Sequence, residues 1–552
     1  MLWRILSRSF SKFEKWKKAA DAELKLKDSW KKFLWNTNEG IAIRPVYFAE
    51  DAIKIPDVPG EFPFMRGPSS TMYTHKPWTI RQPSVFNTIE ESNAFYKASI
   101  AAGQQVLNVY FDLATNRGYD SDNPIVKYDV GRNGVPIDTV DDMRELFNGI
   151  PLANINVNIA INGAALPIMA MFIVTAGEQC ALLKRLQGTI ENDILKEFLG
   201  KNSFIYPPGS SMKIVSDIIS YIAQHLPKYN PISISGYHMK EAGAGNKLEL
   251  AFTLANGLEY IRYACNAGLT VDQIAPRLNF FFGVGMDFYM EIAKLRAARF
   301  LWAELLKEKF DPKNTKSLAL RANCQTSMSS ITAHDPLNNI VRTAIEATAS
   351  VLGGTQSLYT HGYDEAVGGP TENSARIAKN TQSILQEETG ITKVADPWGG
   401  SYFMENLTKE LADAALGVIN EIESLGGMTK AIESGIARKM ILEDAARRRA
   451  KIDSGEETIV GVNKYKVKDE EKMEAQNIDY THIREEQIRK INQLKATRDN
   501  SKVADALDNL RIAAKTGQGN LLELAIEAAR ARATLGEVSK ALEDVYGRYS
   551  LE

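Results

Sequence analysis

Short β-rich runs alternate with longer amphipathic segments between residues 76 and 403, and this alternation restricts the chain to few folds. The segments between the runs, such as 246–266 and 287–307, have a helical period. Eight runs joined by crossover-length helices predict an α/β fold, a (β/α)8 TIM barrel over residues 76–403. An open doubly wound sheet is the rival, although no GxGxxG or P-loop marks a switch point. The runs are WTIRQ (78–82), VLNVYFDL (106–113), INVNIAIN (155–162), GTI (188–190), ISISGYH (232–238), RLNFFFGVG (277–285), SLALRANCQTS (317–327) and TQSLYT (355–360).

The two flanks of the predicted barrel differ from it in composition. Residues 13–75 are rich in charge and then in proline and glycine, which predicts an extended N-terminal arm. Residues 404–552 predict a helical C-terminal region and linker, with a polar connector over 454–482 that contains a short VGVNKY strand. Two further helices are expected at about 483–515 and 519–546. A chain of 552 residues exceeds the size at which one core stops growing, so two or three domains are expected.

Charge and composition exclude several classes of function. The net charge is −2 and no basic stripe is interleaved with aromatic residues, so nucleic acid is not an expected partner. No apolar run approaches membrane-spanning length, and no membrane association is expected. The 3 cysteines are far apart and the 6 histidines show no HxxxH or HExxH spacing. These counts predict a reducing compartment and no protein-ligated metal.

The first twelve residues, MLWRILSRSFSK, contain Arg4, Arg8 and Lys12 and no acidic residue. Wound as a helix, they would gather their large apolar side chains against a basic side. This composition suits a mitochondrial presequence over residues 1–12 and predicts the mitochondrial matrix. The alternative is a basic N-terminal helix that stays on the mature protein, with a cytoplasmic location.

Residues Ser233 to Gly243, SISGYHMKEAG, place a histidine directly after a β-branched run. The run ends at Gly236, and Tyr237 and His238 follow it, with Glu241 in the next turn. The C-terminal end of a barrel strand is where this fold places its chemistry, and imidazole serves as acid, base or hydrogen-bond donor. A buried histidine that is satisfied by a backbone partner would give the same pattern.

Many longer words of the chain, in order over roughly residues 40–550, resemble the catalytic part of methylmalonyl-CoA mutases, which are adenosylcobalamin-dependent acyl-CoA isomerases. Members of that family use a barrel whose strand C-termini face the corrin, while the CoA pantetheine threads down the barrel axis. The words include RGPSSTMY, KPWTIRQ, EESNAFY, FDLATNRGYDSDNP, DDMRELFNGIPL, NDILKEF, SISGYHMKEAG, NNIVRTAIEA, GGTQSL, SARIAKNTQ, VADPWGGSY and VGVNKY.

The resemblance implies roles for particular residues. His238 matches the histidine that hydrogen-bonds the thioester carbonyl, and Gln325 matches a residue that positions the thioester. Lys201 aligns with an arginine that clamps the free carboxylate of the substrate, so it completes the predicted catalytic set. The remaining acyl-CoA-binding candidates are Lys76, Thr79, Arg81, Pro83, Asn108, Asn158, Glu191, Arg277 and Asn279.

A purely structural role would suit three of these residues equally well. Arg277 would suit an external ion pair. Gln325 would suit a satisfied amide in the barrel core, and Arg81 a stem packed on the barrel rim.

Four residues are predicted on the cofactor side. Glu365 matches an acid near the adenosyl ribose, and Glu241 an acid close to the cofactor. Asn116 aligns with a histidine of the corrin-facing rim, and Ser329 with the tryptophan of a Gly-Trp pair. Histidine and asparagine also align with Tyr359 and His361 of this chain.

Several departures from the family pattern fall on the predicted pocket. Pro83 replaces a tyrosine that sits over the migrating group, and Lys201 keeps a charge but loses the arginine fork. Glu191 replaces a glutamine, which adds a negative charge near the thioester if it is ionised. Small hydroxyl residues align with Asn108, Asn158 and Asn279, and a small residue aligns with Tyr110.

The resemblance therefore predicts an acyl-CoA mutase large subunit, by default one converting methylmalonyl-CoA to succinyl-CoA. The sequence contains no Asp-x-His-x-x-Gly word of the family's cobalamin-binding domains. We therefore expect adenosylcobalamin to be held by a partner, either a small cobalamin-binding subunit or another mutase chain. The alternatives are a mutase of different acyl specificity and a non-catalytic mutase homologue that acts as a structural or regulatory partner.

Overall fold

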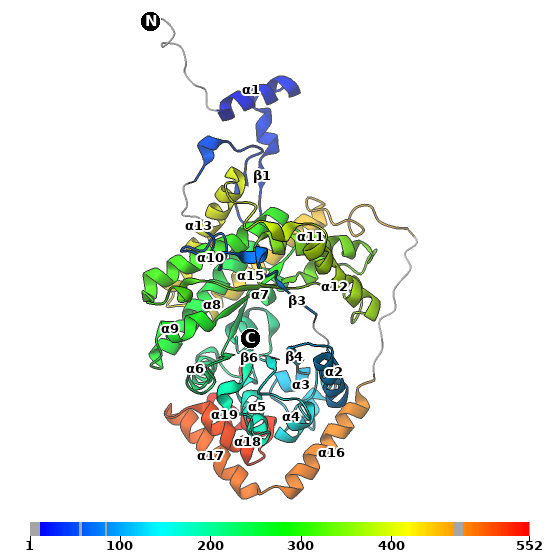
Figure 1. Ribbon diagram of the computed structural model, residues 1–552, viewed down its shortest axis with the longest axis vertical. Coiled ribbons are helices and arrows are strands. Elements are labelled where there is room, and N and C mark those ends of the chain that lie inside the picture. Colours follow the sequence, from blue (N-terminus) through cyan, green and yellow to red (C-terminus); the bar gives the residue numbers. More distant parts are fainter. Residues whose placement is uncertain (1–11, 54–57, 83–84, 469–478, 551–552) are drawn as a thin grey trace, which may run out of the picture.

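The computed structural model describes residues 12–53, 58–82, 85–468 and 479–550. The predicted presequence, apart from Lys12, and the candidate Pro83 lie outside these residues. A central set of parallel strands is surrounded by helices, and the N-terminal arm projects from this body (Figure 1).

The parallel strands follow each other in the order of a (β/α)8 barrel, as predicted. One sheet has the order β4-β5-β6-β7 and the other the order β8-β9-β10-β11-β3. β7 and β8 are two parts of one run, interrupted at Pro231, which has no N–H to donate. The last strand pairs with the first, since β11 pairs with β3, and no ladder joins β3 to β4 among the described residues. The strands are β3 (Thr79–Arg81), β4 (Val106–Tyr110), β5 (Asn156–Ala160), β6 (Gln187–Ile190), β7 (Tyr229–Asn230), β8 (Ser233–Ser235), β9 (Asn279–Val284), β10 (Ala322–Thr326) and β11 (Ser357–Tyr359).

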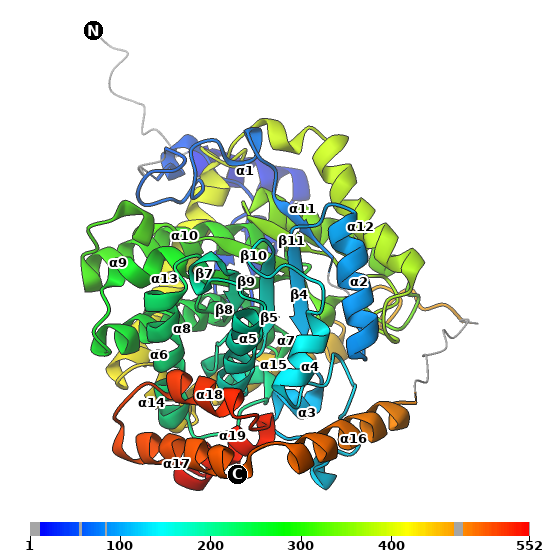
Figure 2. The ribbon, with the colours of Figure 1, turned by 60° about the horizontal axis from the view of Figure 1, so that its bottom comes forward.

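Helices lie between successive strands and surround them (Figure 2). Their apolar faces cover the outer side of the strands and form two large apolar clusters with them. The connecting helices are α2 (Ile89–Ala101), α3 (Leu113–Asn116), α4 (Val140–Leu146), α5 (Ala165–Glu178), α6 (Pro208–His225), α7 (Tyr237–Glu241), α8 (Asn246–Asn266), α9 (Val271–Ile274), α10 (Phe288–Phe310) and α11 (Asn338–Leu352), and α12 (Glu372–Glu387) follows β11.

The C-terminal helices pack outside the barrel in two places. α13 (Tyr402–Ser424) packs on α10 and α8, and α14 (Met428–Glu433) and α15 (Ile436–Ser454) follow it. α18 (Leu521–Arg530) packs on α5 and α6, together with α16 (Thr481–Thr497), α17 (Asn500–Thr516) and α19 (Leu535–Tyr546). Each group completes one of the two large apolar clusters that lie between strands and helices.

Two sequence predictions for the C-terminal region are wrong in detail. The segment expected as two helices forms four, because Asp499 caps α17 and Thr534 forms a capping box at the start of α19. The VGVNKY segment contains only an isolated bridge between Val460 and Lys464 rather than a strand.

Arginine side chains anchor the arm to the barrel. The arm contains α1 (Lys12–Leu24) and a short antiparallel pair, β1 (Trp35–Asn36) and β2 (Ala42–Ile43). Buried Arg299 of α10 donates to the carbonyl oxygens of Phe64, Met65 and Gly353. These bonds satisfy arm carbonyls that would otherwise be buried without partners. No helix of the described residues is both long and apolar enough to cross a bilayer.

Gly188 lets β6 lie close against β5. Its φ is +146°, and a Cβ there would overlap the carbonyl oxygen of Val157. The strand pairing at this point therefore depends on the absence of a side chain.

We expect Gly188→Ala to destabilise the fold by more than about 2 kcal/mol, because the methyl group meets backbone and cannot be relieved by a rotamer. Gly177→Ala is the matched control, because Gly177 lies in α5 with open space around it. That change should stabilise the protein by about 0.5–1 kcal/mol. Denaturant unfolding of both variants measures the difference, and equal stabilities would contradict the role of Gly188.

Candidate functional site

An open channel runs along the barrel axis. Two cavities, of about 320 Å³ and 350 Å³, share the same middle lining residues and so lie end to end. The lower cavity reaches the start of the strands at Val106 and Asn156, and the upper one reaches their ends at Tyr110 and Ala160. The shared residues are Arg81, Asn108, Asn158, Thr189 and Asn323.

The middle of the channel is polar and hydrogen-bonded within itself. Asn158 Nδ2 donates to Asn108 Oδ1 at 3.0 Å, and the Ser357 hydroxyl donates to Asn323 Oδ1 at 2.5 Å. Barrels of this fold are usually filled by bulky branched side chains at these layers. Here short amide and hydroxyl side chains leave space and present groups that suit a polar, extended ligand.

Two cations line the upper cavity without a close carboxylate. The guanidinium of Arg81, at the end of β3, makes no hydrogen bond or ion pair to any described residue, and burial lowers its pKa. Lys201, 31% exposed, lies 4.0 Å from Glu197 Oε1. The hydroxyl of Tyr110 lies in the same cavity, where burial raises its pKa to about 12. Cations that line a cavity without a close carboxylate favour an anionic ligand group.

His238 reaches the same cavity from the end of β8. Gly236 ends the strand, and a Cβ there would meet the Thr253 hydroxyl, so the glycine allows α7 to lie close to α8. The imidazole Nδ1 lies 2.9 Å from Ser235 Oγ and 3.3 Å from Lys196 Nζ. The ring lines the cavity, and no described residue is a hydrogen-bond partner of Nε2.

An ion pair stands behind this imidazole. Lys196 Nζ, 0% exposed, donates to Glu191 Oε2 at 2.9 Å, and Asn162 donates to the same oxygen at 3.0 Å. Burial raises the pKa of Glu191, but Lys196 and then Lys201 outweigh that effect and hold the net pKa well below its usual range. Burial lowers the pKa of His238, and Lys196 and Lys201 lower it further, against an opposing effect of Glu191. Glu191 is therefore an anion and His238 a neutral ring near pH 7.

Glu365 lies in a closed hydrogen-bond network at the upper end of the channel. Its Oε1 accepts from Tyr359 Oη at 3.0 Å and from the Gly362 N–H at 2.6 Å. Its Oε2 accepts from His361 Nδ1 at 2.6 Å and from Tyr359 at 3.2 Å. A carboxylate offers about four acceptor positions, and three donors of its own chain engage this one, since the single hydroxyl proton of Tyr359 is shared between the two oxygens. Gln325 Nε2, 3.0 Å away, contacts the other nitrogen of His361.

The other cofactor-side candidates are also engaged by their own chain. Glu241 accepts from Ser327 Oγ at 2.6 Å and from the Ser329 N–H at 2.8 Å, so it caps the loop after β10. Asn116 donates through Nδ2 to the carbonyl oxygens of Phe111 and Asp112. Its Oδ1 is buried without a hydrogen-bond partner, which makes it the free acceptor of this group.

Most of the substrate-side candidates lie along the channel. Thr79 lines the lower cavity, and Asn279 and Gln325 line the upper one. Arg277 instead lies below β9, where its guanidinium donates to the carbonyl oxygens of Leu226 and Tyr229. Lys76 is exposed on the segment before β3 and belongs to neither cavity.

Adenosylcobalamin is the group that the family resemblance implies at the upper end. The polar groups that could face it gather there from several strands, but Glu365, Glu241 and Ser329 are held by bonds to their own chain. Three donors engage Glu365, which leaves about one acceptor position for a ribose hydroxyl. With the unpartnered Asn116 Oδ1, the groups at this end could therefore accept hydrogen bonds from an adenosyl group without losing an existing bond.

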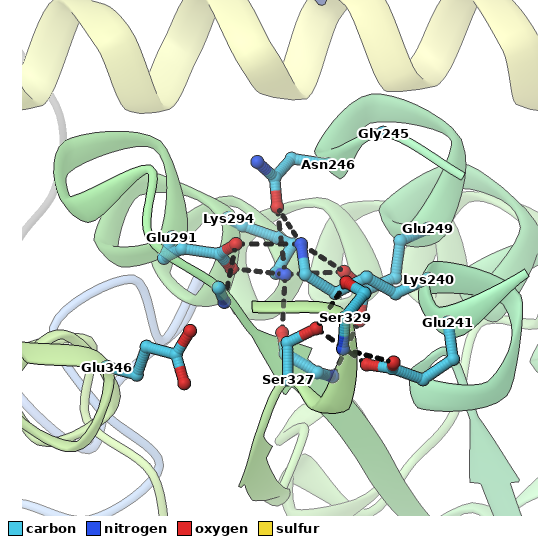
Figure 3. Close-up of polar contacts among 12 residues, drawn as sticks. Lys240, Glu241, Gly245, Asn246, Glu249, Glu291, Lys294, Ser327, Ser329 and Glu346 are labelled. Carbon is cyan, nitrogen blue, oxygen red and sulfur yellow. Dashed lines mark hydrogen bonds and ion pairs between the residues drawn. The ribbon is translucent and has the colours of Figure 1, made fainter. Parts of the chain in front are cut away.

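A buried lysine–carboxylate cluster holds α7, and with it His238, against the strand ends (Figure 3). Lys294 Nζ donates to Glu249 and Glu291 at 2.5 Å each and to the Gly283 carbonyl oxygen at 2.7 Å. Lys240 of α7 donates to Glu291 at 2.7 Å. Two ammonium groups balance two carboxylates, and the cluster links α7, α8, β9 and α10.

Sequence reasoning did not assign Lys196 a role, although it lies in the quoted word NDILKEF. Its burial and its contact with His238 depend on how the loop after β6 returns toward β8. The available signal was Glu191, which is acidic where the family pattern has glutamine. A buried carboxylate is costly unless a cation lies beside it.

Comparisons with known proteins identify the family of the chain. The family model "Methylmalonyl-CoA mutase" matches residues 36–548. The chain is 56% identical to the mouse and human proteins named "Methylmalonyl-CoA mutase, mitochondrial", over 99% of this chain and 73% of each relative. It is 54% identical to a Rhizobium meliloti methylmalonyl-CoA mutase, over 97% of this chain and 75% of that protein.

The fold and the site define a barrel protein with a polar axial channel that ends at an imidazole and two cations. The chain belongs to the methylmalonyl-CoA mutase family.

We expect Lys294→Met to destabilise the protein by about 3–5 kcal/mol, because Glu249 and Glu291 would lose their buried partner. Lys313→Met is the control, since Lys313 is 80% exposed in its pair with Asp311. That change should alter stability by no more than about 0.5 kcal/mol. Thermal unfolding measures both, and a Lys294→Met variant as stable as the wild type would contradict the structural role of the cluster.

Proposed function

We propose that the chain isomerises methylmalonyl-CoA to succinyl-CoA. The observation that supports this proposal most directly is the open polar channel, which ends at the neutral donor His238 and the cations Arg81 and Lys201. The relatives' names agree with this reaction. A barrel whose interior serves only as a hydrophobic core is normally filled by packed side chains.

The channel suits the long arm of a CoA thioester. Amide and hydroxyl groups of Asn108, Asn158 and Asn323 can hydrogen-bond the pantetheine amides along the axis. The thioester then lies in the upper cavity beside His238, and a positioned donor there stabilises charge that builds on the carbonyl oxygen. The strands and helices around the upper cavity shield the reacting acyl group from water.

The acyl end of the ligand meets positive charge. Arg81 and Lys201 can bind a carboxylate, and the Glu191 charge is already balanced by Lys196. This charge distribution favours a carboxylated acyl group over a neutral one.

Adenosylcobalamin, when bound, supplies the radical that starts the rearrangement. We propose that a partner presents it, either a small cobalamin-binding subunit or another mutase chain. The residues that would face it are Asn116, Glu241, Ser329 and Glu365. A mitochondrial matrix location is proposed from the names of the mammalian relatives.

We expect Lys201→Met to weaken methylmalonyl-CoA binding about tenfold while leaving isobutyryl-CoA binding unchanged, because only the first ligand has a free carboxylate. Calorimetric titration of both ligands measures the change. Equal losses for the two ligands would contradict carboxylate recognition by Lys201. A wild-type chain that binds neither thioester would overturn the proposed function.

A second function has one observation in its favour. The engagement of Glu365 by Tyr359, His361 and Gly362 suits a non-catalytic homologue that binds acyl-CoA and pairs with an active mutase chain. Tyr359 and His361 stand where the family pattern has histidine and asparagine, so the closed network arises from these two positions.

The double change Tyr359→His and His361→Asn tests this second function. If the closed network silences the chain, the variant should gain at least tenfold in succinyl-CoA formation when co-expressed with a cobalamin-binding chain and supplied with adenosylcobalamin. A wild-type chain that already turns over under these conditions at a rate equal to the variant's would exclude the second function. Methylmalonyl-CoA affinity is the control and should not change.

A further inference from the structure

Lys196 lies behind the imidazole that faces the channel. Its side chain is 0% exposed, and its ammonium contacts Glu191 Oε2 at 2.9 Å, Glu197 Oε1 at 3.8 Å and His238 Nδ1 at 3.3 Å. Burial lowers the pKa of Lys196, but Glu191, Glu197 and Asp193 raise it by more. The group is therefore an ammonium ion, which can only donate hydrogen bonds.

An ammonium group beside a ring nitrogen decides which nitrogen carries the proton. His238 Nδ1 lies near two groups, Lys196 Nζ and the Ser235 hydroxyl at 2.9 Å. A proton on Nδ1 would face the N–H of the ammonium, so Nδ1 has to present its lone pair. The proton of the neutral ring then lies on Nε2, for which no described residue is a partner and which is available to the cavity.

We propose that Lys196 is a positioning residue, whose ammonium holds His238 as the Nε2–H tautomer so that a neutral imidazole donates to the thioester carbonyl. This inference rests on the proposed function, since it names an acyl-CoA carbonyl as the acceptor. Glu191 completes the device, because it balances the charge of Lys196 inside the barrel. Without Glu191, the ammonium would be buried beside Lys201 with less compensation.

The charged groups around His238 come from two elements. Glu191 follows β6, and Lys196 and Lys201 lie in the loop and the π-helical turn after it (Glu197–Lys201). On its own side, the ring contacts Ser235 and packs near Tyr237. Both lysines disfavour the imidazolium ion and only Glu191 favours it, so the wild-type ring stays neutral from about pH 6 upward.

Removal of the Lys196 ammonium should change which nitrogen of His238 carries the proton, in addition to any effect on protein stability. In Lys196→Met, Glu191 remains as an anion that favours positive charge on His238, and the proton should move to Nδ1, on the side that the ammonium had occupied. Above the new pKa of His238, Nε2 would then present a lone pair to the carbonyl oxygen, and the hydrogen bond is lost. Below that pKa the imidazolium again carries a proton on Nε2, and the bond returns.

The test compares two CoA ligands on the full chain: a methylmalonyl-CoA thioester and its thioether analogue, which lacks the carbonyl group. The quantity compared is the affinity for the thioester divided by the affinity for the thioether. For the wild type, this ratio should be constant between pH 6 and 8.5. In Lys196→Met, the ratio should fall about fivefold at pH 8.5 and recover toward pH 6. Loss of packing alone would weaken both ligands together and would not produce this pH dependence.

Nitrogen NMR of 15N-histidine-labelled protein reads the tautomer directly. The wild type should show a lone-pair-type shift for His238 Nδ1 and a protonated shift for Nε2, assigned by the loss of signals in His238→Gln. The double variant Lys196→Met with Glu191→Gln removes the pair together and is less exposed to misfolding. In it neither an ammonium nor an anion acts on the ring, so the nitrogen shifts should show a mixture of the two tautomers, and the ratio at pH 8.5 should lie between those of the wild type and Lys196→Met. Lys213→Met, on the outer helix α6, is the control and should keep wild-type values.

The outcomes separate the inference from the proposed function. A protonated Nδ1 in the wild type, or a wild-type ratio in Lys196→Met at pH 8.5, overturns the role of Lys196. Failure of the wild-type chain to bind either CoA ligand overturns the proposed function, while the nitrogen shifts still decide the tautomer. If Lys196→Met does not fold, the wild-type shifts and the double variant decide the question.

Discussion

The open axis of the barrel is the constraint on which the rest of this structure depends. Parallel strands are normally stabilised by side chains packed on both faces, and here the inner face gives up that packing in the middle layers. The loss is offset outside, where α5, α8, α10 and α13 bury continuous apolar surface. Inside, amide and hydroxyl groups satisfy each other at fixed distances, so the channel keeps its polar lining without collapsing.

Charge inside the channel follows from the same constraint. A cation buried in a low-dielectric interior is costly unless a carboxylate lies close to it, and Lys196 and Lys294 both have such partners. Arg81 and Lys201 lack a close one, and both line the cavity. The contrast distinguishes cations that hold the structure from cations that are available to a ligand. It also explains why Glu191, newly acidic relative to the family pattern, does not cancel the positive end of the site.

The upper end of the channel shows how several substitutions act as one unit. Tyr359 and His361 together with the Gly362 N–H occupy three acceptor positions of Glu365, and Gln325 contacts the far side of His361. None of these residues alone would fill most of the acceptor positions of the Glu365 carboxylate. Their combination can be evaluated only as a hydrogen-bond network, because each oxygen accepts a limited number of bonds.

The sequence by itself determined the barrel, since the alternation of strand and helix signals states which segments are buried and how they are connected. It also placed His238 at a strand end and, through the family resemblance, assembled a residue set of which His238, Gln325, Arg81, Asn108 and Asn158 line one channel. Only the tertiary structure decided the contact of Lys196 with His238 and the hydrogen bonds around Glu365. These features depend on which atoms from separate segments of the chain come within about 3 Å of one another, because a hydrogen bond forms only at such distances.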